Sequence, residues 1–250
     1  MSIWDALAIL AAGVAAGTIN TVVGSGSLIT FPTLVALGYP PLIANVSNNI
    51  GLVPGSLSGA YGYRRELVGQ AGRLRRLAPA SLLGSLAGSV LLLSLPSDLF
   101  DSVVIVLVAV ALVLVVAQPW LVRRLADRPW GQRRQEVTPV LASLVCLAGV
   151  YGGYFGAAQG IILMALLGIF LDDHLQRHNA TKNVLALTVN TVASVVFVVS
   201  TEVDWAVVAL IAVGSTIGGQ VGARVGRRLD PRVLRGVIVT VGLIALIRLW

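Results

Sequence analysis

Hydrophobic residues run through the chain in long stretches that are interrupted by short polar ones, a pattern that predicts helices crossing a membrane. A helix of about 20 apolar residues crosses a lipid bilayer. The apolar segments that qualify as membrane elements are 3–37, 42–63, 77–95, 102–122, 139–171, 179–200, 205–223 and 233–250. Six of these have the length of a single crossing, whereas the first and the fifth are too long for one. We therefore expect an all-α polytopic membrane protein.

Each of the two long segments contains a glycine-rich break. GSGS (24–27) interrupts segment 3–37, which ends at GYPP (38–41), and GAAQG (156–160) interrupts segment 139–171. A chain that turns back at such a break forms a re-entrant hairpin of two short helices. Irregular backbone at membrane depth is tolerated only where protein buries it or where it lines a cavity. Both breaks are therefore expected inside the protein.

The composition agrees with a lipid environment. The 250 residues are 56% hydrophobic and 12% charged, and the mean hydropathy is +0.88. The formal charge of +7 raises the question of nucleic acid, but the arginines lie in short clusters between apolar runs and are not interleaved with aromatic residues. We therefore expect no nucleic-acid partner. The single cysteine, Cys146, lies in an apolar run and excludes an intramolecular disulfide.

The arginine clusters test how the long segments run. Five arginines lie at 64–76, five at 123–134 and five at 224–235, whereas the loops at 96–101 and 201–204 are acidic and carry no base. Lysine and arginine concentrate in cytoplasmic loops. All three clusters are cytoplasmic only if the second long segment is re-entrant. The same reasoning makes the first one re-entrant and places both termini in the periplasm.

The two halves of the chain also resemble each other in sequence. A shift of 134 positions aligns NVSNNI (45–50) with NATKNV (179–184), Gly26 with Gly160, and residues 95–108 with 229–242. The sequence therefore predicts two repeats, 1–122 and 139–250, joined by a basic cytoplasmic linker at 123–138. Each repeat has one re-entrant hairpin and three crossings, an odd number, so the second repeat is inverted. Inverted repeats with broken helices are typical of secondary transporters, with the substrate site near the membrane midplane.

Two stretches carry a resemblance to a known family. They are GTINTVVGSGSLITFPTLVALGYPPLIANVSNNIGLVPGS and GVYGGYFGAAQGIILMALLGIFLDDHLQRHNATKNVLA. They resemble the two signature regions of the TauE/SafE membrane family of sulfite exporters and 4-toluenesulfonate uptake permeases. The resemblance implies a bacterial inner-membrane permease for sulfite, sulfoacetate or related sulfonates. Family members commonly carry glycines after the first half-helix, where this chain has Ser25 and Ser27.

Independently of that resemblance, the breaks suit an anion. Helices that restart near Ser27 and Ile161 would aim their N-termini, with a partial positive charge, at the point where the hairpins meet. Hydroxyl and amide groups add hydrogen-bond donors without a fixed charge. Single small polar groups are equally often contacts between helices. The candidate substrate-binding residues are Gly24, Ser25, Gly26, Ser27, Asn45, Asn48, Asn49, Gln159, Gly160, Asn179, Thr181, Lys182 and Asn183.

Lys182 is the only lysine and the sharpest candidate. It either extends to the cytoplasmic interface or turns inward as the cation of an anion path. We favour the inward position, because its neighbours Thr181 and Asn183 have polar counterparts at Ser47 and Asn49 in the first repeat.

Other chemistry is weakly supported. His174 and His178 have a spacing that suits a metal pair, but histidines at a membrane interface are more common, so we expect neither metal nor cofactor. No acidic residue lies deep in an apolar segment, and the coupling ion stays open between H⁺ and Na⁺. No nucleophile has a base beside it. We therefore expect a secondary anion transporter and not an enzyme; a passive anion channel is the closer alternative, and an intramembrane enzyme the more distant one.

Overall fold

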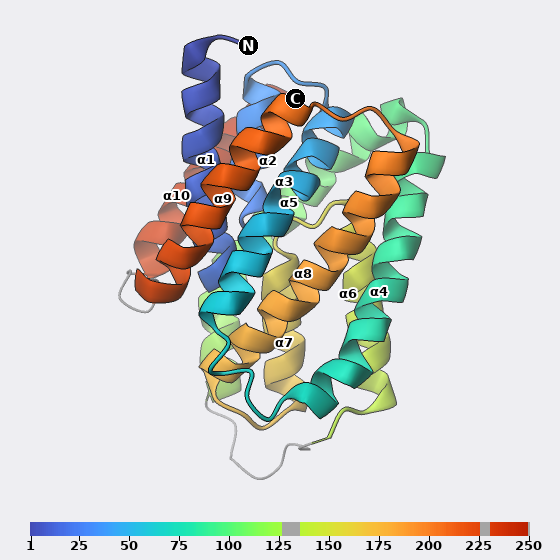
Figure 1. The fold of residues 1–250 in the computed structure, drawn as a ribbon, viewed down its shortest axis with the longest axis vertical. Coiled ribbons are helices and arrows are strands. Elements are labelled where there is room, and N and C mark those ends of the chain that lie inside the picture. The colour runs from blue at the N-terminus through green and yellow to red at the C-terminus, as the bar shows by residue number, and fades with distance from the viewer. Residues whose placement is uncertain (127–135, 226–230, 250) are drawn as a thin grey trace.

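The computed structural model describes residues 1–126, 136–225 and 231–249, and these form ten α-helices (Figure 1). Most of the linker expected at 123–138 lies outside the described residues. The all-α prediction is confirmed. The helices are α1 (Ile3–Val22), α2 (Ser27–Ala36), α3 (Pro41–Gly62), α4 (Ala71–Ser94), α5 (Ser97–Ala126), α6 (Pro139–Tyr154), α7 (Gln159–Phe170), α8 (Leu175–Ser200), α9 (Trp205–Val225) and α10 (Pro231–Leu249).

Five helices among the described residues, α1, α4, α5, α8 and α9, are long and apolar enough to cross a membrane. Helix α3 has 22 residues, which is also enough, but Asn45, Asn48, Asn49 and Pro54 reduce its apolar character. The three asparagines are buried against other helices. A helix that meets protein on most sides can cross the membrane without an apolar surface. With five apolar helices of sufficient length, the chain is a multi-pass membrane protein.

Both expected breaks are present. Helix α1 ends at Val22 and α2 begins at Ser27, while α6 ends at Tyr154 and α7 begins at Gln159. The two helices that flank each break contact each other, α1 with α2 and α6 with α7. We call the two helices that flank a break its first and second arm. The arms of the first break are unequal: α1 has 20 residues and α2 has 10, or about 30 Å and 15 Å at the helical rise. The first arm is therefore longer than the half-helix expected from the sequence.

Glycines bring the first arm of each break close to a helix of the other half of the chain. Helix α1 packs on α9, and α6 packs on α4. A Cβ atom on Gly17 of α1 would lie 2.2 Å from the carbonyl oxygen of Ser215 in α9. A Cβ atom on Gly88 of α4 would lie 2.0 Å from the carbonyl oxygen of Val150 in α6. Close packing through small residues is how membrane helices associate without a hydrophobic driving force.

Three aromatic rings hold the second break in place. Phe155, in that break, meets Phe31 of α2 edge to face at a centroid distance of 5.2 Å. Phe100 of α5 lies 6.5 Å from the same ring. All three side chains are buried. Edge-to-face rings contribute about 0.5–1.5 kcal/mol each beyond the area they bury, so α2 and α5 are tied to the break between α6 and α7.

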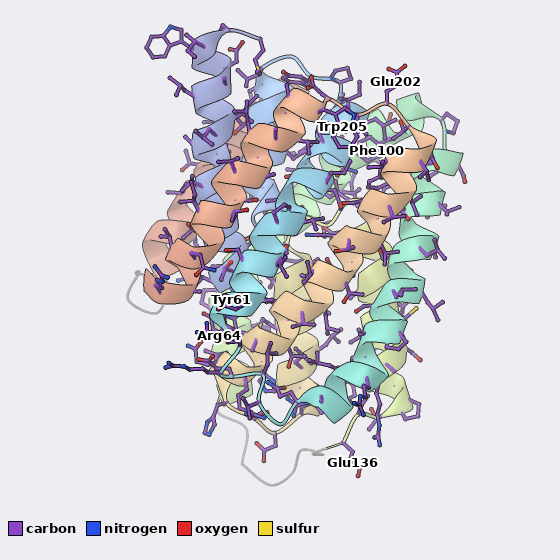
Figure 2. All side chains as sticks on the ribbon, viewed as in Figure 1. Tyr61, Arg64, Phe100, Glu136, Glu202 and Trp205 are labelled. Atoms are coloured by element: carbon purple, nitrogen blue, oxygen red, sulfur yellow. The ribbon has the colours of Figure 1, made fainter. Side chains whose placement is uncertain are left out.

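Polar contacts join two connections at one end of the molecule, the α3–α4 connection and the α7–α8 connection. The Arg73 guanidinium donates to the Asp173 carboxylate at 2.9 Å, and the Arg177 Nε does so at the same distance. Gln70 accepts from the Thr181 hydroxyl at 2.7 Å and donates to the Arg177 carbonyl at 3.0 Å. Figure 2 shows Arg64 and Glu136 towards this end and Glu202 at the opposite one. The polar contacts therefore clamp the arginine-rich end.

Candidate functional site

The two helix breaks touch each other through their backbones. The Gly160 amide at the start of α7 donates a hydrogen bond of 3.0 Å to the carbonyl oxygen of Gly24, which lies between α1 and α2. A Cβ atom on either glycine would lie 2.4 Å from the Cα of the other. Glycine is required at both positions because any larger residue would occupy the space of the opposite backbone.

The conformation of each break explains its sequence. Gly24 has φ +90° and Gly156 has φ +78°, values that glycine adopts without strain. Ala158 has φ +60° and is the only described non-glycine residue with a positive φ. Strained backbone of this kind costs about 1–3 kcal/mol and is concentrated at functional sites. At the shift of 134 positions Ala158 aligns with Gly24, so the same turn recurs in both breaks.

Lys182 lies inside the protein and not at the interface. Its side chain is fully buried, with 0% exposure, and Nζ donates to the carbonyl oxygens of Asn20 at 2.9 Å and Thr21 at 3.1 Å. These carbonyls belong to the last turn of α1, the negative end of its dipole. An ammonium group has three N–H donors, so these bonds leave one that is available to a ligand.

Asparagines from α3 and α8 bind the ends of the first arms crosswise. Asn179 and Asn183 of α8 donate to the Thr21 carbonyl of α1, at 3.2 Å and 3.4 Å. Asn45 of α3, which aligns with Asn179, donates to the Tyr154 carbonyl of α6 at 3.0 Å. Each asparagine therefore reaches the helix end of the opposite half.

The polar side chains at the starts of α2 and α7 are held in different ways. The Asn48 amide donates to the Ser27 hydroxyl at 3.2 Å and accepts from Thr30. The Gln159 amide donates to a carbonyl of α6 at 3.2 Å. Ser25 is buried, and its Oγ has no hydrogen-bond partner among the described residues. Gly26 packs on α1, because an added Cβ atom would lie 2.4 Å from the Ala16 carbonyl.

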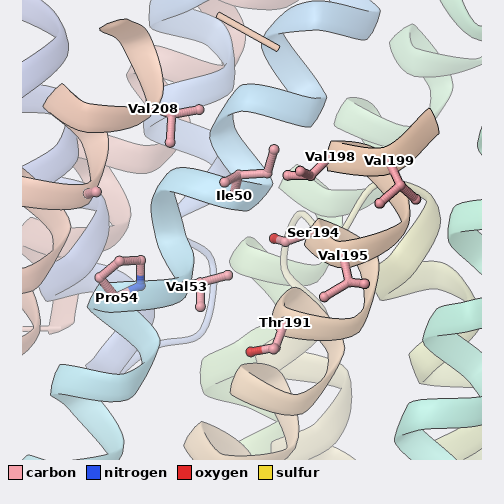
Figure 3. A pocket seen from close by; sticks show the side chains of 10 residues that line it. Ile50, Val53, Pro54, Thr191, Ser194, Val195, Val198, Val199 and Val208 are labelled. Atoms are coloured by element: carbon pink, nitrogen blue, oxygen red, sulfur yellow. The ribbon is translucent and has the colours of Figure 1, made fainter. Parts of the chain in front are cut away.

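Two of the candidate residues make their contacts elsewhere. Thr181 belongs to the polar contacts around Gln70. Asn49 accepts from the Ser194 hydroxyl at 3.2 Å, beside a pocket of about 410 Å³ between α3, α8 and α9. Figure 3 shows valine side chains around this pocket, with Ser194 and Thr191 as its hydroxyl groups. Its lining is too apolar for a bare anion. The remaining candidates lie on or beside the breaks.

The sequence interpretation missed a polar contact between the two central helices. Asn190 of α8 donates to the Ser56 hydroxyl of α3 at 3.2 Å, and Asn20 of α1 donates to the same oxygen at 3.4 Å. Ser56 and Asn190 are separated by 134 positions. The shift that aligned the two halves was a signal that would have found this pair.

The described residues hold no group of three or more histidine, cysteine, aspartate or glutamate side chains arranged to bind a metal ion. The donors at the breaks are amides, hydroxyls, backbone groups and one ammonium. Such a set can bind an anion through its N–H and O–H groups, and a hard cation through its carbonyl oxygens.

Comparison with known proteins gives relatives that are named as probable membrane transporters. "Probable membrane transporter protein YfcA" of Escherichia coli (strain K12) is 27% identical over 201 residues, covering 80% of this chain and 72% of its own. "Probable membrane transporter protein" of Haemophilus influenzae is 27% identical over 214 residues, covering 84% and 81%. "Probable membrane transporter protein ORF9" of Sinorhizobium sp is 27% identical over 237 residues, covering 94% and 88%. No solved structure gives a significant match.

A sequence model of one protein family, described as "Sulfite exporter TauE/SafE", matches residues 9–249. The match spans both helix breaks and all of α3 and α8, the helices that supply the asparagines and the lysine. This chain is a multi-pass membrane transporter protein that belongs to the sulfite exporter TauE/SafE family.

Proposed function

We propose that the protein is a secondary transporter of small sulfur-containing or organic anions, and that it holds the substrate where the two helix breaks meet. The observation that carries this proposal is the contact between Gly24 and Gly160. The Lys182 ammonium of α8 is hydrogen-bonded to the end of α1 that leads into this contact. Broken helices that meet inside a transporter are typical of substrate sites near the membrane midplane.

The chemistry of this region favours an anion. The N-termini of α2 and α7 each add a partial positive charge. The buried Ser25 hydroxyl and the remaining N–H of Lys182 are further donors. Because two carbonyl oxygens already share the ammonium, its attraction for an anion is reduced. A transported ion must bind tightly enough to enter and weakly enough to leave.

The same proposal includes the membrane arrangement. The segments 3–37 and 139–171 are re-entrant hairpins, and the two repeats, 1–122 and 139–250, are inverted around the breaks. The packing of α1 on α9 and of α6 on α4 supports this, because each pair joins a first arm to a helix of the other repeat. The arginine clusters support a cytoplasmic position for the clamped end, with both termini in the periplasm of an inner-membrane protein.

The family supports the proposed substrate class. Its description names sulfite export, and sulfite and sulfonates present the oxyanion oxygens that the donors at the breaks would bind. The clamp of Arg73, Asp173 and Arg177 would close the cytoplasmic side while the other side is open. Alternating access then requires this clamp to open.

Transport into proteoliposomes tests the proposal. Purified protein is assayed by counterflow with sulfite, thiosulfate, sulfoacetate, sulfate and simple carboxylates. We expect saturable exchange of sulfur oxyanions or sulfonates. Transport of only cations or neutral solutes would overturn the proposal. A passive channel would give ionic current far faster than carrier turnover, and an intramembrane enzyme would change the anion chemically, which analysis of the recovered anion detects.

A further inference from the structure

The two breaks differ in one charge. At the shift of 134 positions, Lys182 of α8 aligns with Asn48 of α3. In the first break the Lys182 ammonium rests on the terminal carbonyls of α1. In the second break the Asn48 side chain does not play this part, because it bonds to Ser27 and Thr30 of α2 instead. The terminal carbonyl of α6 therefore has no ammonium equivalent to Lys182 among the described residues.

The end of α6 brings together the oxygen atoms of the Tyr154 carbonyl and the Asn45 amide. The carbonyl of Tyr154 ends α6, at the negative end of that helix dipole. Asn45, which aligns with Asn179, lies beside it and is only 2% exposed. The Oδ1 atom of Asn45 has no hydrogen-bond partner among the described residues, and the same is true of the Oδ1 atom of Asn179 in the first break. A buried acceptor without a donor is costly and calls for a specific explanation.

We propose that the Asn45 Oδ1 and the Tyr154 carbonyl oxygen form a binding site for a monovalent cation, Na⁺, which is the coupling ion of the transporter proposed above. The Asn45 Nδ2 now lies 3.0 Å from the Tyr154 oxygen. A half-turn of the amide places Oδ1 there instead, and the two oxygens then form a chelating pair. Hard cations take carbonyl and amide oxygens as ligands, and helix C-termini bind Na⁺ in other transporters with broken helices.

The inference explains why the breaks differ. The first break carries its own cation, tethered as Lys182, whereas the second requires one from solution. A cation bound at the end of α6 lies next to the start of α7, where the proposed anion binds. Each ion then lowers the electrostatic cost of binding the other, and by linkage this effect is reciprocal. Movement of the anion is then coupled to movement of Na⁺, in whichever direction the two gradients drive it.

Thermal unfolding of the purified full chain in detergent tests the site without transport. The melting temperature is measured against NaCl concentration, with choline chloride holding ionic strength constant. We expect Na⁺ to raise the melting temperature of the wild type and choline to leave it unchanged. Asn45→Ala should raise the half-saturating Na⁺ concentration at least about tenfold, because it removes one ligand of a charged group. Asn190→Ala removes a buried asparagine away from the helix ends and should keep the wild-type value.

A second variant gives an opposite result. Asn45→Asp sets a carboxylate oxygen against the Tyr154 carbonyl, a repulsion that a bound cation relieves. It should melt at a lower temperature than the wild type in choline and regain most of this loss in Na⁺. If Na⁺ does not stabilise the wild type, or if Asn45→Asp shows no larger response to Na⁺ than the wild type, the cation site is refuted.

Proteoliposomes separate the failure of this inference from the failure of the proposed function. An imposed inward Na⁺ gradient should accumulate the substrate anion, and replacing Na⁺ by choline should abolish accumulation. Anion exchange that is indifferent to Na⁺ would refute the inference and leave the proposed function standing. Na⁺ stabilisation that depends on Asn45, in a protein that moves no anion, would support the site and refute the transporter.

Discussion

Gly160→Ala is the most direct test of the contact between the helix breaks. The new Cβ atom would lie 2.4 Å from the Cα of Gly24 and 2.9 Å from its carbonyl oxygen. Carbon atoms in contact lie about 3.5–4.0 Å apart, so the breaks must separate by about 1 Å. That displacement also breaks the hydrogen bond between the Gly160 amide and the Gly24 carbonyl, which is 3.0 Å long.

The close contact and the lost hydrogen bond together set the size of the destabilisation. Overpacking costs about 1–3 kcal/mol, and an unsatisfied buried donor costs a further 1–3 kcal/mol or so. The intrinsic helix propensity acts in the opposite direction, because alanine is about 1 kcal/mol better than glycine within a helix. We expect Gly160→Ala to destabilise the protein by at least about 1 kcal/mol. We also expect anion exchange to fall at least about tenfold, because a displacement of about 1 Å at the breaks misplaces the donors around the substrate.

Gly72→Ala is a matched control. Gly72 is the second residue of α4 as Gly160 is of α7, and an added Cβ atom there meets nothing within 4 Å. The control should melt at or above the wild-type temperature and should retain wild-type exchange. Both variants are purified, compared by thermal unfolding, and assayed by counterflow at equal protein content. Wild-type melting and exchange in Gly160→Ala would refute the close contact of the breaks.

Three further predictions concern the lysine, the clamp and the topology. Lys182→Gln should weaken anion binding at least about tenfold, because a charge-assisted hydrogen bond is lost, and Lys182→Arg should recover only part of it; unchanged affinity in Lys182→Gln would remove the lysine from the site. Burial alone would raise the pKa of Asp173, but hydrogen bonds from Arg177, the His174 amide and Arg73 outweigh it and hold that pKa below its usual value. The stabilisation by Asp173 is therefore full above its unfolded pKa and is lost as the pH falls through the lowered folded pKa. Asp173→Asn should destabilise the protein at pH 7, and its melting temperature should fall less steeply on acidification than that of the wild type. An equally steep fall in the variant would contradict the clamp. A cysteine placed at position 40, in a background without the native cysteine, should react with impermeant reagents from the periplasm, and labelling only from the cytoplasm would contradict the re-entrant first segment.

Local signals predicted the positions of the breaks well. Helix α2 begins at Ser27 as expected, and α7 begins at Gln159, two residues before the expected Ile161. Glycine next to small polar residues inside an apolar run has few structural explanations, so the sequence alone was informative. The inward position of Lys182 was predicted from its polar neighbours, and the structure places it there.

Contacts made by backbone atoms left no comparable signal. The carbonyl oxygens of Thr21 and Tyr154 accept the asparagine and lysine donors, and nothing in a side chain marks them. Helical rotation explains why two of the candidate residues make their contacts elsewhere. Successive residues of an α-helix point about 100° apart, so Asn49 and Thr181 share the polar sequence pattern of their neighbours but face Ser194 and Gln70.

The glycine packing of α1 on α9 bears on the biosynthesis of the protein. Gly17 of α1 meets the backbone of Ser215, almost two hundred positions later in the chain. While the ribosome makes α2 to α8, this face of α1 has no permanent partner, and lipid fills narrow glycine grooves poorly. The first half therefore cannot reach its final packing before α9 is inserted. Folding of this protein is completed after translation of both halves, and fragments split within the central linker should have to be co-expressed to become resistant to proteases.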